Sequence, residues 1–337
     1  MLYHLGMIKL ALKVILLAVS ALLLGACTRS QPLPRPVAYE AIPKLSADLG
    51  PGAYELPRSS AKHERPYLLY LPEDYRAEGQ FPLLLLLHGG GGSAAQFARN
   101  IVIEQDADEF GFIIVFANGS HRFEEGDLLR TWNSGHCCTY AMEQGIDDVA
   151  FLSTLIEELL VALPLDPDRV FVAGLSNGAM MANRLAAERS ELIAGAASVS
   201  GSLGGYAEPG AELFIPPQPA NPLRFLAIHG RLDQNVLYAG GHGPNTTGER
   251  IDLSVEDQMA FWAAANGCSP VPTGRAEADN LLYYWLYGNC EPGGETQLLS
   301  IEDGGHAWPG ARENLLPDRP SRLISANQLI LEFFSQP

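Results

Sequence analysis

The stretch that decides the fold is VFVAGLSNGAMMA, residues 170–182, in which Ser176 stands between Gly174 and Gly178. A β-branched apolar run precedes the serine and an alanine- and methionine-rich run follows it, so the sequence predicts a strand that turns sharply into a helix. Glycines on both sides of the turn indicate that neighbouring backbone comes too close for side chains. We therefore expect a strained turn that exposes the Ser176 hydroxyl at a strand end.

The rest of the chain alternates short apolar runs with runs of helical spacing. Residues 83–87 are five consecutive leucines followed by His88 and four glycines, as expected for a strand buried on both faces of a sheet. The other expected strands are residues 67–71, 113–117, 170–173, 196–200, 225–228 and 296–301, and the expected helices are residues 149–163, 179–188, 255–265 and a closing segment after Ser325. This alternation predicts an α/β fold with a mostly parallel sheet covered by helices on both faces.

The first residues have the pattern of an export signal. Lys9 and Lys13 precede an apolar run at residues 14–25, which is shorter than the roughly 20 residues that span a bilayer. The run ends in Leu-Gly-Ala-Cys, which resembles the lipobox of bacterial lipoproteins, so we expect Cys27 to be acylated and to anchor the protein to a membrane outside the cytoplasm. The alternatives are an ordinary cleaved signal, which would release a secreted protein, and a short anchor helix.

Three segments follow from this interpretation. Residues 1–27 are expected to be the signal peptide, and residues 28–60, which contain six prolines, are expected to be a tether. Residues 61–337 then form a single domain, because no repeat and no Gly/Ser linker interrupts them.

Export to an oxidising compartment favours disulfides among the remaining cysteines. Cys268 and Cys290 lie 22 positions apart, and a bridge between them would contribute about 3 kcal/mol. The adjacent pair Cys137 and Cys138 has three possible states: a vicinal disulfide, separate pairings, or free thiols. The sequence contains no CxxC motif, so we expect no metal site.

The formal net charge of −17 limits the possible partners. A chain with this negative charge has no electrostatic attraction to nucleic acid or to an anionic lipid surface. Its contact with a membrane is therefore expected through the lipid anchor only. Neutral or weakly charged substrates fit this balance better than polyanions.

A serine is a weak nucleophile and requires a base that a third group orients. In the arrangement that follows a G-x-S-x-G turn in α/β-hydrolases, the acid and then the histidine come after the serine. His306 is the best candidate base, since it lies in a glycine-rich loop directly after an expected strand. His229 ends a strand and is more typical of a sheet edge, whereas His242 lies in a loop with no strand before it.

The candidate acid is Asp233, just beyond the strand at residues 225–228. Ligands of open parallel sheets bind at the carboxyl ends of the strands, where Asp233 is expected to lie. Asp252 and Asp257 are alternatives, but both come at the start of a helix, where capping explains them. Asp303 is too close in sequence to His306 to be a strong candidate.

Two backbone amides are expected to bind the oxyanion of an acyl-transfer reaction, at about 3 kcal/mol each. One is the amide of Asn177, at the start of the helix after Ser176. The other is the amide of Gly90 in the glycine loop after residues 83–87, which resembles the HGGG loop of lipases and esterases. The alternative is that these glycines only permit a sharp turn.

Taken together, these motifs resemble the secreted polyhydroxybutyrate depolymerase and feruloyl esterase family over roughly residues 60–335. The matching stretches are LHGG (87–90), RTWNSGHCC (130–138), GIDDVAFL (145–152), DPDRVFVAGLSNGAMM (166–181), HGRLDQNV (229–236) and GGHAWPG (304–310). The resemblance implies an α/β-hydrolase fold and carboxylic-ester hydrolysis without a cofactor, with Ser176 as nucleophile, Asp233 as acid and His306 as base. This chain departs from the family pattern at Gly90, where cysteine is common, and at Ala179, where glycine is common.

The resemblance leaves the ester open. Hydroxybutyrate oligomers and feruloyl or acetyl esters of polysaccharide fragments are equally consistent with it, and the absence of a recognisable polymer-binding region favours soluble substrates. Trp132 and Trp308 are candidates for lining the substrate pocket, or for packing alone. A serine peptidase on the same fold and a non-catalytic binding lipoprotein are the alternative functions.

Overall fold

The leucine run at residues 83–87 lies inside an 11-stranded sheet, in strand β6 (Phe81–Leu87). The computed structural model describes residues 36–46, 48–60, 63–122, 129–246, 248–312 and 318–336. The expected signal, Cys27 and the first part of the expected tether lie outside these residues. Every residue of β6 is buried, and its leucines contribute alternately to two hydrophobic clusters on opposite faces of the sheet.

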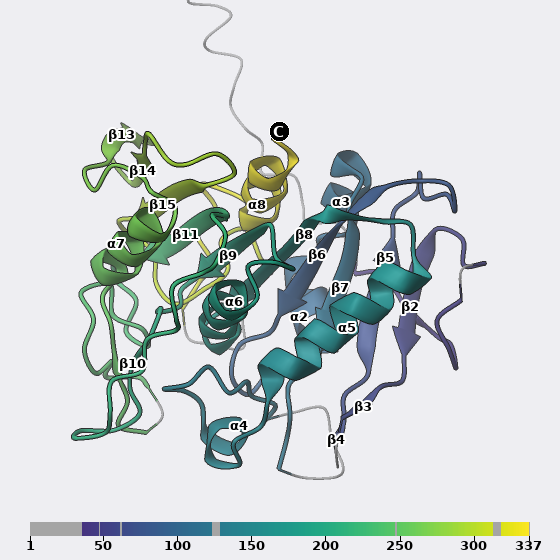
Figure 1. The fold of residues 1–337 in the computed structure, drawn as a ribbon. Helices are drawn as coiled ribbons and strands as arrows, with labels where there is room; N and C mark the ends of the chain where they lie inside the picture. The colour runs from purple at the N-terminus through teal and green to yellow at the C-terminus, as the bar shows by residue number, and fades with distance from the viewer. Residues whose placement is uncertain are drawn as a thin grey trace, which may run out of the picture. The chain divides into compact units, whose positions relative to one another are not determined.

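The sheet is mixed, with a parallel centre and antiparallel margins (Figure 1). Its strands follow the spatial order β1 (Glu40–Ala41), β2 (Gly52–Leu56), β5 (Tyr67–Leu71), β7 (Ile113–Ala117), β6, β8 (Leu165–Leu175), β9 (Gly195–Val199), β11 (Arg224–Gly230), β15 (Glu295–Ile301), β14 (Leu282–Tyr287) and β13 (Thr273–Glu277). All pairs from β7 to β15 are parallel. The carboxyl ends of these strands therefore meet at one edge, where side chains from distant parts of the chain come together.

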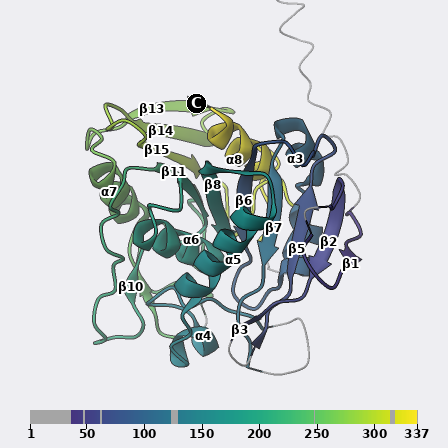
Figure 2. The ribbon, with the colours of Figure 1, turned by 45° about the vertical axis from the view of Figure 1, so that its right-hand side comes forward.

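Helices cover both faces of the sheet, as the alternating pattern predicts (Figures 1 and 2). One face packs against α5 (Asp148–Ala162), α6 (Asn177–Glu188) and α7 (Val255–Ala265). The other packs against α2 (Ala94–Ile101), α3 (Glu104–Phe110) and α8 (Ala326–Ser335). A short helix, α4 (Thr139–Glu143), and two small sheets complete the structure, β10 (Gly205–Tyr206) with β12 (Ile251–Asp252) and β3 (Ser59–Ser60) with β4 (His63–Glu64). The predicted α/β class is confirmed.

The sheet begins earlier in the chain than the tether prediction allows. Within the expected tether of residues 28–60, β1 and β2 are the two outermost strands at one margin of the main sheet. Strand β2 is held there because it pairs with β5 and buries Leu56, which is 1% exposed. The strand is difficult to recognise from the sequence because its alternation of apolar and polar residues is short and is flanked by prolines. The antiparallel strands β13 and β14 are a second addition that the apolar pattern of the sequence did not indicate.

The local signals at helix starts and the cysteine spacing agree with the structure. Ser254 and Asp257 form a capping box at α7, and Asp147 caps α5 through the Ala150 amide. Cys268 and Cys290 form the expected disulfide, with an S–S distance of 2.07 Å. Within the described ranges, none of the helices combines the length and the apolar character that crossing a bilayer would demand.

Candidate active site

Ser176 lies in the turn between β8 and α6 with φ 56° and ψ −121°, a conformation that a residue with a side chain rarely adopts. The two flanking glycines make this turn possible. A Cβ atom on Gly174 would collide with the backbone of Gly178, and one on Gly178 would collide with the carbonyl of Leu87 at the end of β6. The strained turn that the sequence predicts is therefore present.

Asp233 and His306 come together from the ends of the neighbouring strands β11 and β15. His306 Nδ1 donates a hydrogen bond of 2.8 Å to Asp233 Oδ2. The other carboxylate oxygen, Asp233 Oδ1, accepts the backbone amides of Asn235 at 2.8 Å and Val236 at 2.9 Å. The carboxylate is thus fixed by its own loop and directed at the imidazole.

The environment keeps Asp233 ionised. Burial alone would raise the pKa of this carboxyl, but hydrogen bonds from His229 and His306 outweigh burial and hold its pKa well below the usual range. His229 Nε2 lies 3.4 Å from Asp233 Oδ2 and 2.9 Å from the Val236 carbonyl. His229 therefore helps to keep the Asp233 carboxylate ionised, a role that its position at the end of a strand does not indicate.

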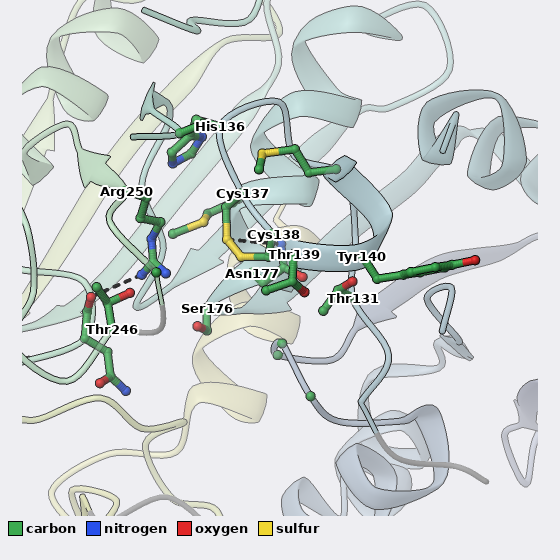
Figure 3. Close-up of a pocket in the computed structure, with 18 of the residues that line it drawn as sticks. Thr131, His136, Cys137, Cys138, Thr139, Tyr140, Ser176, Asn177, Thr246 and Arg250 are labelled. Atoms are coloured by element: carbon green, nitrogen blue, oxygen red, sulfur yellow. Dashed lines mark hydrogen bonds between the residues drawn. A yellow bond between two sulfur atoms is a disulfide. The ribbon is translucent and has the colours of Figure 1, made fainter. Parts of the chain in front are cut away.

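His306 and Ser176 line the same cavity, which has a volume of about 900 Å³. Figure 3 shows Ser176 among the residues of this cavity. Asp233 lies behind His306 and is 1% exposed. The His306 loop is also held through its backbone, because the His306 amide donates to Asp318 Oδ2 at 2.7 Å. Among the alternatives, His242 and Asp303 are exposed, and Asp257 caps α7. The structure thus brings Ser176, His306 and Asp233 to one edge of the sheet.

The glycine loop after β6 lies directly beside the Ser176 turn. Gly89, Gly90 and Gly91 line the cavity, and a Cβ atom added to Gly90 would lie 3.5 Å from the Asn177 Cβ. Asn177 is the first residue of α6, and the first amides of a helix have no partner within the helix. The glycine loop and the first turn of α6 are therefore neighbours at the Ser176 turn, which is the placement that the predicted oxyanion site requires.

Trp132 and His88 fix the position of the glycine loop through hydrogen bonds on the side away from the cavity. The Asn177 side chain accepts from the Trp132 amide at 2.8 Å and donates to the Trp132 carbonyl at 3.0 Å, and the indole of Trp132 donates to the His88 carbonyl at 3.0 Å. The Gly119 amide donates to His88 Nε2 at 3.0 Å, so the ring proton lies on Nδ1, which donates to the Gly89 carbonyl.

Of the two alternatives for Trp132 and Trp308, pocket lining or packing alone, their burial agrees with packing. Trp132 is fully buried and Trp308 is 1% exposed, and neither is among the described residues that line the cavity. The Trp308 indole donates to Asn327 at 2.9 Å and packs edge-to-face on Phe97. A tryptophan that is close in sequence to a catalytic candidate can point either into the cavity or into the core. Here both rings are buried in the core.

Two further features lie at the cavity wall, and the first is one of the three cysteine states that the sequence left open. Cys137 and Cys138 are joined as a vicinal disulfide and line the cavity. Asp252, expected to cap a helix, instead binds His136 at 3.0 Å and Arg250 at 3.0 Å. Arg250 is only two positions from Asp252, but His136 is 116 positions away, so no local motif signals the contact with His136.

His88 should make stability depend on pH. Burial lowers the pKa of His88 to about 3, whereas an exposed histidine titrates near 6.5. Because the folded state resists protonation, the contribution of His88 is complete above about pH 6.5 and is lost as pH falls toward 3. We expect the difference in free energy of unfolding between wild type and His88→Gln to shrink by about 1 to 2 kcal/mol when the pH is lowered from 7 to 5. Urea denaturation of both proteins measures this difference, with the exposed His242→Gln as control; a difference independent of pH would refute it.

Comparisons with known proteins find similar esterases. Residues 65–211 match the model of a family described as esterase PHB depolymerase. Feruloyl esterase B of Piromyces equi is 30% identical over 244 residues, covering 72% of this chain and 42% of that protein. An acetylxylan esterase of Coprinopsis cinerea is 25% identical over 281 residues, covering 77% and 72% of the two chains.

Solved structures share the fold. Acetyl xylan esterase from Aspergillus awamori superimposes with a TM-score of 0.54 at 16% identity, covering 80% of this chain and 93% of that one. The chain spans less than half the length of the Piromyces relative. The molecule thus has the α/β-hydrolase fold, and the similar proteins named above are called esterases.

Proposed function

Starting from the match of residues 65–211 to the PHB depolymerase esterase family, we propose that this protein is a serine esterase that cleaves carboxylic esters. One observation carries the proposal. His306, which is hydrogen-bonded to Asp233, lines the same cavity as Ser176, a serine in a strained turn at the same edge of the sheet. An imidazole oriented by a buried carboxylate is the base that a serine nucleophile requires.

The reaction follows from these positions as two acyl transfers. Because His306 Nδ1 donates to Asp233, its Nε2 is free to take the proton of Ser176 as the serine oxygen attacks the ester carbonyl. The amides of Gly90 and Asn177 stabilise the oxyanion. As the intermediate collapses, His306 gives its proton to the leaving alcohol, and water then repeats the sequence on the acyl-enzyme to release the acid.

The relatives indicate which esters to test. Their names, feruloyl esterase and acetylxylan esterase, and the PHB depolymerase family support feruloyl esters, acetyl esters and hydroxybutyrate oligomers as candidate substrates. We also propose that the protein acts outside the cytoplasm, anchored by a lipid on Cys27, on the strength of the signal-like N-terminal sequence.

A substrate panel tests the proposed reaction. We expect the purified protein to cleave at least one of methyl ferulate, an acetylated xylo-oligosaccharide and 3-hydroxybutyrate trimer, with acid release followed by liquid chromatography. A peptide p-nitroanilide serves as the amide comparison. Cleavage of the amide but of none of the esters would favour the peptidase alternative and overturn the esterase proposal.

A further inference from the structure

Three of the residues that line the cavity beside Ser176 each carry a buried polar atom with no hydrogen-bond partner in the described part of the chain. The atoms are His136 Nδ1, Asn235 Oδ1 and Thr246 Oγ1. Figure 3 shows His136, Arg250 and Thr246 along one side of this space. Since a buried polar atom without a partner costs free energy, such a cluster indicates a place where a ligand supplies the missing hydrogen bonds.

The three residues form one connected structure. Arg250 donates to both carboxylate oxygens of Asp252 and, through Nη2, to the Asn235 carbonyl at 3.1 Å. The Thr246 loop is tied to the same segment, because the Asn245 amide donates to the Gln234 carbonyl at 3.0 Å. The unpartnered atoms are thus held at defined positions by a network that does not itself use them.

The orientation of His136 defines what it can bind. Its Nε2 lies 3.0 Å from Asp252 Oδ1 and 3.1 Å from Ser202 Oγ, and its ring stacks on Phe214. Because Ser202 and Asp252 contact the same nitrogen, they cannot form a second serine–histidine–aspartate relay. Asp252 is ionised and only accepts hydrogen bonds, so the ring proton lies on Nε2 and Nδ1 is an acceptor.

The charges around these atoms favour a neutral ligand. Burial would raise the pKa of Asp252, but hydrogen bonding with His136 and the charge of Arg250 outweigh burial and lower it, so the carboxylate neutralises Arg250. Glu208 and Glu249 also line the cavity. A carboxylate on the ligand would therefore meet no uncompensated positive charge here. Ligand hydroxyl groups, in contrast, can donate hydrogen bonds to the imidazole nitrogen of His136 and the amide oxygen of Asn235, and can exchange a hydrogen bond with the Thr246 hydroxyl.

We propose that His136, Asn235 and Thr246 form a hydroxyl-binding subsite that selects esters carrying free hydroxyl groups next to the reacting bond. This inference rests on the proposed esterase function. The hydroxyl groups belong either to the alcohol part of the ester, as in a sugar, or to the acyl part, as in a hydroxyacyl ester. A cavity of about 900 Å³ is large enough for either.

Binding to a catalytically blocked protein tests the subsite without relying on turnover. In the Ser176→Ala background, calorimetry measures the dissociation constants of two matched pairs of esters. The first pair is an acetylated methyl xyloside and tetrahydropyran-3-yl acetate, and the second is methyl 3-hydroxybutyrate and methyl butyrate. We expect the hydroxylated member of at least one pair to bind ten-fold or more tighter, and the pair that shows it identifies the source of the hydroxyl.

Two variants assign the preference to the subsite. His136→Phe keeps an aromatic ring against Phe214 but removes the nitrogen, and Thr246→Val removes only a hydroxyl. Each should reduce the preference at least three-fold, whereas Thr154→Val, on an exposed face of α5, should keep it. Thr246→Val decides the question if His136→Phe does not fold.

The outcomes separate the subsite from the esterase proposal. Equal binding of both members in both pairs, or a preference that survives the Thr246→Val change and a folded His136→Phe protein, would overturn the subsite. A clear preference in a protein that hydrolyses no ester would retain the subsite and overturn the esterase proposal instead.

Discussion

Replacing Ser176 by alanine is expected to lower kcat for ester hydrolysis by at least about 10⁴-fold with little change in KM. The substitution removes the atom that attacks the carbonyl, while the oxyanion amides and the cavity stay in place. Alanine has no polar side-chain atom and suits the turn no worse than serine, so the protein should fold. Initial rates with p-nitrophenyl butyrate measure the loss, and circular dichroism checks the fold.

Ser46→Ala is a matched control for this experiment. Ser46 lies on the surface, where its hydroxyl accepts the Asp48 amide, and its removal should leave kcat within two-fold of wild type. If the Ser176→Ala protein retained more than a tenth of the wild-type kcat, the nucleophile would have to lie elsewhere.

Changing Asp233 to asparagine is expected to lower kcat by about 10³- to 10⁴-fold. The geometry determines how the new amide sits. The Asn235 and Val236 amides donate to Oδ1, so the side-chain oxygen of asparagine stays there and its NH₂ group takes the Oδ2 position facing His306. An NH₂ group donates to His306 Nδ1 and shifts the ring proton to Nε2, which then cannot accept the Ser176 proton.

Asp303→Asn provides the comparison, since Asp303 is exposed and lies only three residues before His306. Its kcat should stay close to that of wild type. Stopped-flow rates with p-nitrophenyl butyrate measure both variants. An Asp233→Asn protein that is folded and as active as the Asp303→Asn protein would show that Asp233 does not orient the base.

The main fold and the catalytic candidates are predictable because the signals for them are local. The turn at Ser176 is constrained by residues within two positions of it, and apolar runs closed by glycines mark the parallel strands. Asp233 and His306 follow two such strands, and the carboxyl ends of parallel strands meet at one edge. Sequence alone therefore suffices to bring these groups together.

The cavity wall is not predictable in the same way. The contact between His136 and Asp252 joins a loop to strand β12 across 116 positions of sequence, and no motif near either residue indicates the other. The buried positions of Trp132 and Trp308 likewise depend on which side of a loop packs on the core. Features that determine substrate choice arise from such loops, which is why the sequence predicts the reaction but not the ester.

Covalent labelling with an alkyl fluorophosphonate tests the central claim most directly, because a serine activated by a neighbouring base displaces fluoride from phosphorus much faster than an ordinary serine does. We expect the intact mass of the wild-type protein to increase by one phosphonyl group, peptide mapping to place that group on Ser176, and Asp233→Asn to slow the labelling. An active protein that stays unlabelled, or that carries the group on another residue, would contradict the account.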